Sequence, residues 1–289
     1  MDLLTKAVTK DGFMRIYFAN SRETVEKARK YHNLSPVASA ALGRTLVAGQ
    51  LMGAMLKNDE ATVTIQFKGG GEAGIVLVVG DAKGGVKGYI ENPYVDLPLN
   101  RKGKLDVGGA VGKNGFLSVI RDLKMKEPYI GQVPIVSGEI AEDIANYFAV
   151  SEQIPTVCGL GVLVNPDLTV KAAGGYLIQL LPFADESCID KLEANVNTLQ
   201  PVTAMLDSGM SAEDIAKRVL EGLEPDLLDE FEVFYKCDCN KSRVEKALIS
   251  LGKEELSKMA EEEEQIEVCC HFCDKKYEFT VEDLKKFLK

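Results

Sequence analysis

Cysteines are concentrated at the carboxy-terminal end of this 289-residue chain. Five of the seven lie beyond residue 236, and four of them form two close pairs, Cys237-x-Cys239 and Cys270-x-x-Cys273. Two thiol pairs separated by a long loop can supply four thiolates to one tetrahedral zinc ion. We therefore predict a small zinc-binding domain over residues 232–289, with these four cysteines as its ligands.

The first pair is unusual, because Cys237 and Cys239 are close enough in sequence to react with each other. Cα atoms two residues apart in an extended chain are separated by up to about 7 Å. A relaxed disulfide prefers about 5.5–6 Å, so a Cys237–Cys239 bond requires a bent, strained backbone. Strained disulfides are the labile, regulatory kind. The pair is therefore expected to serve a zinc site when reduced and a reversible switch when oxidised.

The remaining cysteines and the nearby histidine are expected to lie outside the metal site. Cys269 precedes the second pair in a strand-like stretch and should point away from Cys270. His271 lies inside the Cys270–Cys273 spacing, which itself favours the two thiolates. Cys158 and Cys188 have no partner nearby in the sequence, and we expect them to act as small buried hydrophobic residues.

The amino terminus indicates a cytoplasmic protein. Residues 1–6 show no basic region followed by an apolar run, so no signal peptide is expected. Thiols are normally kept reduced in the cytoplasm, and clustered cysteines there indicate metal or redox chemistry. The apolar run of residues 36–56 has Arg44 near its middle and is interpreted as a buried core helix that starts at Ser35 and Pro36, not as a membrane span.

The net charge of −10 is confined to one segment. Residues 185–232 contain 13 acidic and three basic residues, whereas the rest of the chain has equal numbers of each sign. Neither part offers the basic stripe that nucleic-acid binding uses, so no nucleic-acid partner is expected.

The pattern of strand-like and helical segments predicts an α+β fold in three parts. Residues 1–182 are predicted to form an N-terminal mixed sheet-and-helix core domain, since strands and helices alternate there without a regular βαβ rhythm. Residues 183–231 are predicted to form an acidic helical linker, and residues 232–289 the C-terminal four-cysteine domain. A hairpin is expected around residues 81–84, and Asn20 is expected to cap an early helix.

The clearest helix of the linker begins at Ser211, which forms a capping-box pattern with Asp214. Ile215, Val219 and Leu220 fall on one narrow apolar face of this helix, and the opposite face is strongly acidic. Short isolated helices are marginal in water, so this segment is expected to be stable only while it is docked.

The sequence leaves three classes of function open. A four-thiolate zinc knuckle is most often purely structural, and such a module could belong to a transcription or translation complex, although a pI of 5.0 argues against that. A thiol–disulfide oxidoreductase could use Cys270 and Cys273, but it would need them at a helix start in a thioredoxin-like unit. No serine elbow and no paired carboxylates indicate hydrolysis, and we do not expect an enzyme.

The whole chain resembles the 33 kDa chaperonin family, the bacterial redox-regulated heat-shock holdases. The resemblance rests first on Cys237-Asp238-Cys239-Asn240 and Cys270-His271-Phe272-Cys273 with their separation. Further matching stretches are Ser39-Ala40-Ala41-Leu42-Gly43-Arg44, Ser151-Glu152-Gln153, Asn165-Pro166-Asp167 and Ala173-Gly174-Gly175.

This resemblance implies an ATP-independent chaperone of the stress response that is quiescent when reduced and zinc-bound. Oxidation would form the disulfides Cys237–Cys239 and Cys270–Cys273, release zinc and favour a homodimer. Cys269 departs from the minimal four-cysteine pattern, so an alternative pairing stays open.

The size of the zinc contribution suggests how such a switch would work. Structural zinc contributes about 10–16 kcal/mol to the folding of a small domain, whereas a disulfide closing a three- or four-residue loop contributes less than about 2 kcal/mol. Exchanging the metal for these bonds should unfold the cysteine domain. We expect the linker then to lose a docking surface, which would make the apolar faces around Ile215, Val219 and Leu220 accessible to unfolded clients.

Overall fold

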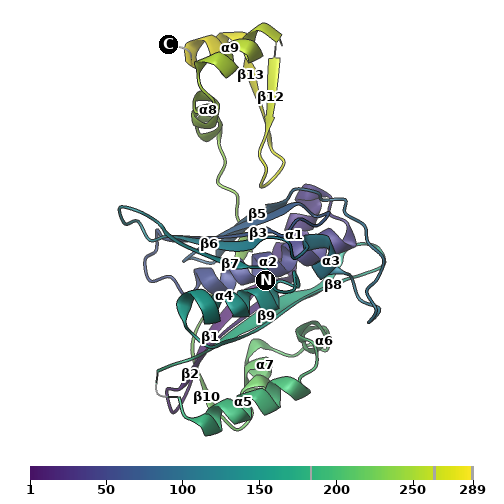
Figure 1. The fold of residues 1–289 in the computed structure, drawn as a ribbon, viewed down its shortest axis with the longest axis vertical. Coiled ribbons are helices and arrows are strands. Elements are labelled where there is room, and N and C mark those ends of the chain that lie inside the picture. The colour runs from purple at the N-terminus through teal and green to yellow at the C-terminus, as the bar shows by residue number, and fades with distance from the viewer. Residues whose placement is uncertain (183, 263–264, 288–289) are drawn as a thin grey trace. The chain divides into compact units, whose positions relative to one another are not determined.

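A computed structural model describes residues 1–182, 184–262 and 265–287 of the chain. Residue 183, where the predicted linker begins, lies outside this part. The chain divides into two compact units, Met1–Lys236 and Cys237–Lys289, each with its own hydrophobic core (Figure 1). Sheets and helices are mixed in both units, so the predicted α+β class is confirmed.

The first unit contains a five-stranded antiparallel sheet in the order β10-β1-β2-β9-β8. The central strand β9 is buried on both faces, as in a sheet that is covered on both sides, whereas β10 at one edge is mostly exposed. Their bounds are β1 (Leu3–Thr9), β2 (Met14–Asn20), β8 (Thr156–Val164), β9 (Val170–Leu180) and β10 (Pro225–Glu232).

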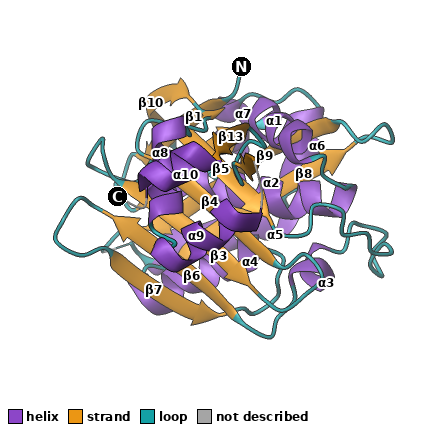
Figure 2. Ribbon diagram, turned by 90° about the horizontal axis from the view of Figure 1, so that it is seen from above, coloured by secondary structure: helices purple, strands orange, loops and turns teal. Residues whose placement is uncertain are grey.

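A second, six-stranded sheet in the same unit has the order β11-β5-β4-β3-β6-β7 (Figure 2). The predicted hairpin around residues 81–84 is confirmed, since it joins β4 to β5 in this sheet. The strands are β3 (Thr62–Lys68), β4 (Ile75–Asp81), β5 (Gly85–Ile90), β6 (Phe116–Asp122), β7 (Tyr129–Pro134) and the short parallel β11 (Phe234–Tyr235).

Helix α2 (Pro36–Gly53) lies between the two sheets and forms the centre of the main core (Figure 1). All its residues except Pro36 and Arg44 are buried, which explains why its sequence is apolar all round. Ser35 caps it and Pro36 occupies its first turn, as predicted. The backbone of α2 packs closely on β4, because a Cβ atom on Gly49 would lie 2.6 Å from Val78 Cγ1.

Four further helices of the first unit contact α2 or the strands next to it. They are α1 (Arg22–His32), α3 (Val107–Val111), α4 (Ala141–Tyr147) and the π-helix η1 (Phe148–Glu152). The expected Asn20 cap of α1 is wrong. The Asp2 carboxylate accepts hydrogen bonds from the backbone N–H groups of Glu23 and Thr24 instead, at 3.0 and 2.6 Å. The side chain of Asp2, 20 positions before the first residue of α1, therefore pairs with N–H groups that have no partner within the helix.

The acidic segment covers the other face of the five-stranded sheet with α5 (Glu186–Thr198), α6 (Val202–Asp207) and α7 (Ala212–Val219). The capping box of Ser211 and Asp214 is confirmed. The end of the segment is not helical: β10 pairs with β1 and places Leu4 opposite Phe231. The free edge of β1 offers this stretch a hydrogen-bonding partner, and that pairing outweighs its weak helical pattern.

The second unit is a small α+β module around a β-hairpin. Its core consists of Leu248, Leu256, Ile266, Tyr277, Phe279 and Leu284. Its elements are α8 (Lys241–Ile249), α9 (Lys253–Glu262), β12 (Gln265–Cys269), β13 (Lys276–Thr280) and α10 (Val281–Phe287).

Candidate metal centre

Cys237 and Cys239 lie in the irregular stretch just before α8. Asn240 caps that helix, and its side chain accepts a hydrogen bond from the backbone N–H of Arg243 at 3.0 Å. This cap ends the irregular stretch directly after Cys239. The amino-terminal end of a helix carries partial positive charge, so it favours negative charge on the neighbouring thiolates.

Cys270 and Cys273 lie in the turn between β12 and β13. The Cys270 backbone N–H donates to the Lys275 carbonyl at 2.9 Å, and the Asp274 N–H donates back to the Cys270 carbonyl at 2.9 Å. Asp274 adopts a left-handed conformation with φ of 55°. These bonds fold the turn into a tight knuckle between β12 and β13.

The two pairs meet, and the four sulfur atoms lie within 4.8 Å of one another. The Cys237–Cys270 and Cys239–Cys273 sulfur distances are 3.6 and 3.5 Å. Four thiolates at about 2.3 Å from a tetrahedral zinc ion would lie about 3.8 Å apart. The donor set and its spacing therefore fit a four-thiolate metal centre. None of the seven cysteines forms a disulfide in the structure.

The protein environment shifts the pKa values of Cys237 and Cys239 in opposite directions. Burial is the main cause that raises the pKa of Cys237 above its usual range. Burial also opposes ionisation of Cys239, but the Tyr277 hydroxyl donates a hydrogen bond to its sulfur at 3.1 Å. With the neighbouring thiols, that bond lowers the pKa of Cys239 to about 7. Cys239 is thus prepared to bind a metal as a thiolate.

The predicted non-ligands lie outside the four-sulfur cluster. Cys269 is exposed, and its sulfur lies 3.8 Å from Glu267 Oε1. Neither Cys269 nor His271 belongs to the metal-ligating group. Cys188 is buried and Cys158 packs against the main core, as expected for small hydrophobic residues.

The apolar linker residues lie in the other unit. Ile215, Val219 and Leu220 are almost completely buried in a cluster that includes Ile16 and Phe18 of β2. Their docking surface is therefore the five-stranded sheet. The expectation that the cysteine domain supplies this surface is wrong, because α7 finds a continuous apolar sheet face within its own unit.

Tyr277 is the one residue at the site that sequence reasoning missed. The alternation of exposed and buried residues along its strand is the signal that could have identified it. Tyr277 and Phe279 share the buried face of β13, and the Cys270–Cys273 knuckle ends four residues before Tyr277.

Comparison with known proteins finds related chains along nearly the whole length of this one. The family model described as Hsp33 protein matches residues 2–280. The chain is 49% identical over 285 residues to a 33 kDa chaperonin of Alkaliphilus metalliredigens, covering 99% of this chain and 98% of the relative. It is 50% identical over 289 residues to a 33 kDa chaperonin of Clostridium perfringens, covering 100% of this chain and 91% of the relative.

A solved structure agrees with the fold. The crystal structure of the 33 kDa chaperonin from Thermotoga maritima superposes with a TM-score of 0.92 at 38% identity, covering 99% of this chain and 97% of that one. These relatives are named chaperonins, not enzymes, in agreement with the sequence interpretation. Among the described residues, no helix is both long and apolar enough to cross a bilayer.

Proposed function

This chain belongs to the Hsp33 family, and on that premise we propose that it is a redox-regulated, ATP-independent holdase of the cytoplasm. It would bind unfolding proteins during oxidative stress and prevent their aggregation. The observation that carries the proposal is the convergence of four thiols within 4.8 Å, two of them in a C-x-C pair. With an oxidant such as peroxide, which accepts two electrons for each disulfide formed, such a cluster can exchange a metal for disulfides.

In the reduced state, Cys237, Cys239, Cys270 and Cys273 would hold Zn²⁺ and keep the second unit folded. The core of that unit is small, and domains of this size usually need a metal or disulfides. Oxidation would form Cys237–Cys239 and Cys270–Cys273 and release the ion. Two disulfides in such short loops contribute less than about 4 kcal/mol to folding, whereas zinc contributes roughly 10–16 kcal/mol. The unit would therefore unfold.

Unfolding of the second unit would reach the linker through the chain that joins them. One residue, Lys236, separates Cys237 from β11. β11 consists of only two residues, Phe234 and Tyr235, which pair with β5. Loss of this short strand would loosen the neighbouring β10 and α7. Undocking would then expose two apolar surfaces, the helix face with Ile215, Val219 and Leu220 and the sheet face that it covers.

The charge of the segment supports this role. Residues 185–232 carry a net charge of −10, which would keep the opened chaperone soluble while its apolar surface is exposed. We propose that the oxidised form associates as a homodimer and needs neither nucleic acid nor membrane. The β-hairpin position of Cys270 and Cys273 differs from the helix start that a thioredoxin-like oxidoreductase uses.

The test is aggregation of a chemically unfolded client, followed by light scattering in the presence of reduced or oxidised protein, with and without ATP. We expect suppression by the oxidised protein only, and no effect of ATP. Equal suppression by both thiol states would contradict the redox switch, and a requirement for ATP would contradict the holdase mechanism.

A further inference from the structure

Two methionines close the turn between α6 and α7, residues 205–210, which we call the methionine turn. Met210 directly precedes Ser211, the N-cap of α7, and its backbone N–H donates to the Met205 carbonyl at 3.2 Å. Gly209 adopts the positive φ of 84° within this turn. Both methionines pack in the cluster that docks α7 on the five-stranded sheet. Their thioethers therefore belong to the surface that holds the linker in place.

Met210 is placed to hold the start of α7. It occupies the position before the N-cap, and Ile215 occupies the fourth helical position. Apolar residues at these two positions commonly pack together and fix the direction in which the chain enters the helix. Both residues belong to the docking cluster, and Ile215 is completely buried. Because α7 has only eight residues, it depends on such apolar contacts to remain folded on the sheet.

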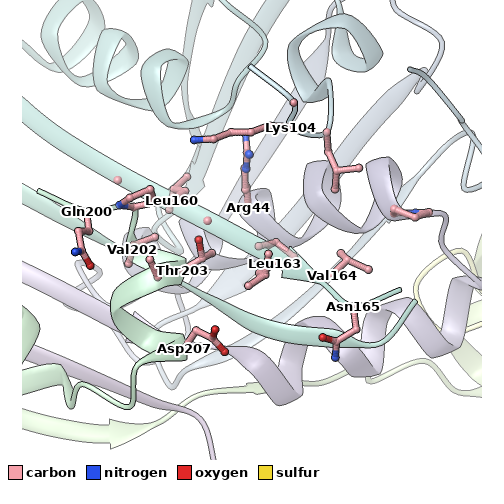
Figure 3. A pocket seen from close by; sticks show the side chains of 18 of the residues that line it. Arg44, Lys104, Leu160, Leu163, Val164, Asn165, Gln200, Val202, Thr203 and Asp207 are labelled. Atoms are coloured by element: carbon pink, nitrogen blue, oxygen red, sulfur yellow. The ribbon is translucent and has the colours of Figure 1, made fainter. Parts of the chain in front are cut away.

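The docking of α6 is incomplete on one side. The helix packs closely at two glycines, since a Cβ atom on Gly161 of β8 would lie 2.8 Å from Val202 Cγ1. A Cβ atom on Gly174 of β9 would lie 2.7 Å from Leu206 Cδ1. A cavity of about 890 Å³ lies beside these contacts and is lined by Val202 and Thr203 (Figure 3). The side chains that border this cavity lack packing partners there, so the methionine turn contributes more to docking.

Met210 is more accessible than the other methionines of the cluster. Met14 and Met205 are almost completely buried, whereas Met210 is half-buried. The turn borders open space, because a Cβ atom on Gly209 would meet no atom within 4 Å. A small oxidant can therefore reach Met210 while the linker is docked. Oxidation converts the apolar thioether into a polar sulfoxide, and a polar oxygen among largely apolar side chains is unfavourable.

We propose that Met210 is a second oxidation site of this chain, separate from the four cysteines, at which hypochlorite loosens the docking of α7. The sulfur lone pair forms the new S–O bond, the O–Cl bond breaks, and chloride leaves with its electron pair. The sulfoxide would turn toward water and separate Met210 from Ile215. The proposal rests on the proposed function, since it regulates the same client surface, but it requires neither a disulfide nor the loss of zinc.

The test oxidises the full chain with hypochlorite and then adds thiol and zinc, which restore the cysteine centre but leave methionine sulfoxide in place. Hydrogen exchange of the α7 amides reports docking, and aggregation of an unfolded client reports activity. After this treatment, we expect exchange to stay about tenfold or more faster than before oxidation, and client protection to persist. Methionine sulfoxide reductases should reverse both effects.

Substitutions at Met210 separate its oxidation from that of other residues. Met210→Leu keeps the apolar contact but cannot be oxidised, so its exchange should return to the initial rate after thiol and zinc are added. Met210→Gln places a polar chain of similar length in the turn and should speed exchange in the reduced, unoxidised protein. The matched controls Met125→Leu and Met125→Gln change an exposed methionine and should behave like the parent protein.

Three results would overturn the proposal. They are the absence of sulfoxide at Met210 by peptide mass analysis, full recovery of the sulfoxide-bearing parent protein with thiol and zinc alone, and equally persistent exchange in Met210→Leu. Faster exchange that depends on Met210 but brings no client protection would support the oxidation site. It would contradict instead the proposal that docking masks the client surface, so the two failures are distinguishable.

Discussion

Tyr277 donates its hydroxyl hydrogen to the sulfur of Cys239 at 3.1 Å, while its ring is buried in the core of the second unit. This bond links the metal site to the packing of the domain around it. Groups that hydrogen-bond to metal ligands orient them, and their loss typically costs about 10–100-fold in metal affinity.

Tyr277→Phe tests that link, because it removes the hydroxyl and keeps the ring. We expect zinc affinity, measured by competition with a chelating dye, to fall about tenfold. The exposed Tyr94 provides a control, and Tyr94→Phe should change nothing. If Tyr277→Phe binds zinc as tightly as the parent protein, the hydrogen bond does not support the site.

Val219→Asp tests the docking of α7. Val219 is completely buried against the sheet, and an unpaired buried carboxylate costs about 3–5 kcal/mol. The helix should undock, so the reduced variant should suppress aggregation without oxidant and bind more of an apolar-surface dye.

Lys217→Asp is the matched control, since it places an aspartate on the exposed face of the same helix. It loses only a solvent-exposed pair with Glu213 and should remain inactive when reduced. Activity in the control, or inactivity of reduced Val219→Asp, would contradict the idea that docking masks the client surface.

Disulfide mapping tests the proposed pairing. Two short sulfur–sulfur distances join the two cysteine pairs, Cys237 with Cys270 and Cys239 with Cys273. We propose instead that the disulfides form within each pair. Peptide mass analysis after oxidation should find Cys237–Cys239 and Cys270–Cys273. The same pairs should form in Cys269→Ser. Disulfides between the two cysteine pairs would hold the second unit together, and finding them would count against unfolding on oxidation.

Glu26 gives the first unit a pH-dependent stability. Its hydrogen bond from Arg29 is the main cause that lowers its pKa from 4.5 to about 2, and it also accepts the Val170 N–H at 2.9 Å. A lowered carboxyl pKa stabilises the fold above the unfolded value and loses that effect as the pH falls toward the folded one.

Glu26→Gln should therefore lower the free energy of unfolding of the first unit, measured in urea at pH 7, by about 1–2 kcal/mol after allowance for screening. The difference from the parent protein should shrink as the pH falls from 5 toward 3. The exposed Glu72→Gln should show no such trend. A difference that is independent of pH would mean that the charge of Glu26 is not its cause.

The four-cysteine cluster was predictable because cysteine spacing is a local property of the sequence. Ser35, Ser211 and Asn240 were also predictable as caps, since each acts on the helix that it precedes. What escaped prediction depends on contacts between distant residues. Asp2, which precedes β1, caps α1, and Tyr277 reaches Cys239 from 38 residues away.

The docking surface of α7 escaped prediction for the same reason. Its apolar face shows that Ile215 and Val219 need a partner, but a helical period does not identify that partner. The β2 residues Ile16 and Phe18 are about 200 positions away in sequence. Likewise, β10 is a strand only because β1 has an edge available for pairing.

The central claim is that a metal holds the chaperone inactive, and one sample followed through oxidation tests it most directly. Zinc release, helicity of the chain and protection of an unfolding client are measured together under peroxide and mild heat, and again after thiol and zinc are restored. We predict about one zinc ion per reduced chain, with its release followed by loss of helicity and gain of protection, all reversible. A reduced protein without zinc, or protection that does not change with zinc release, would contradict the account.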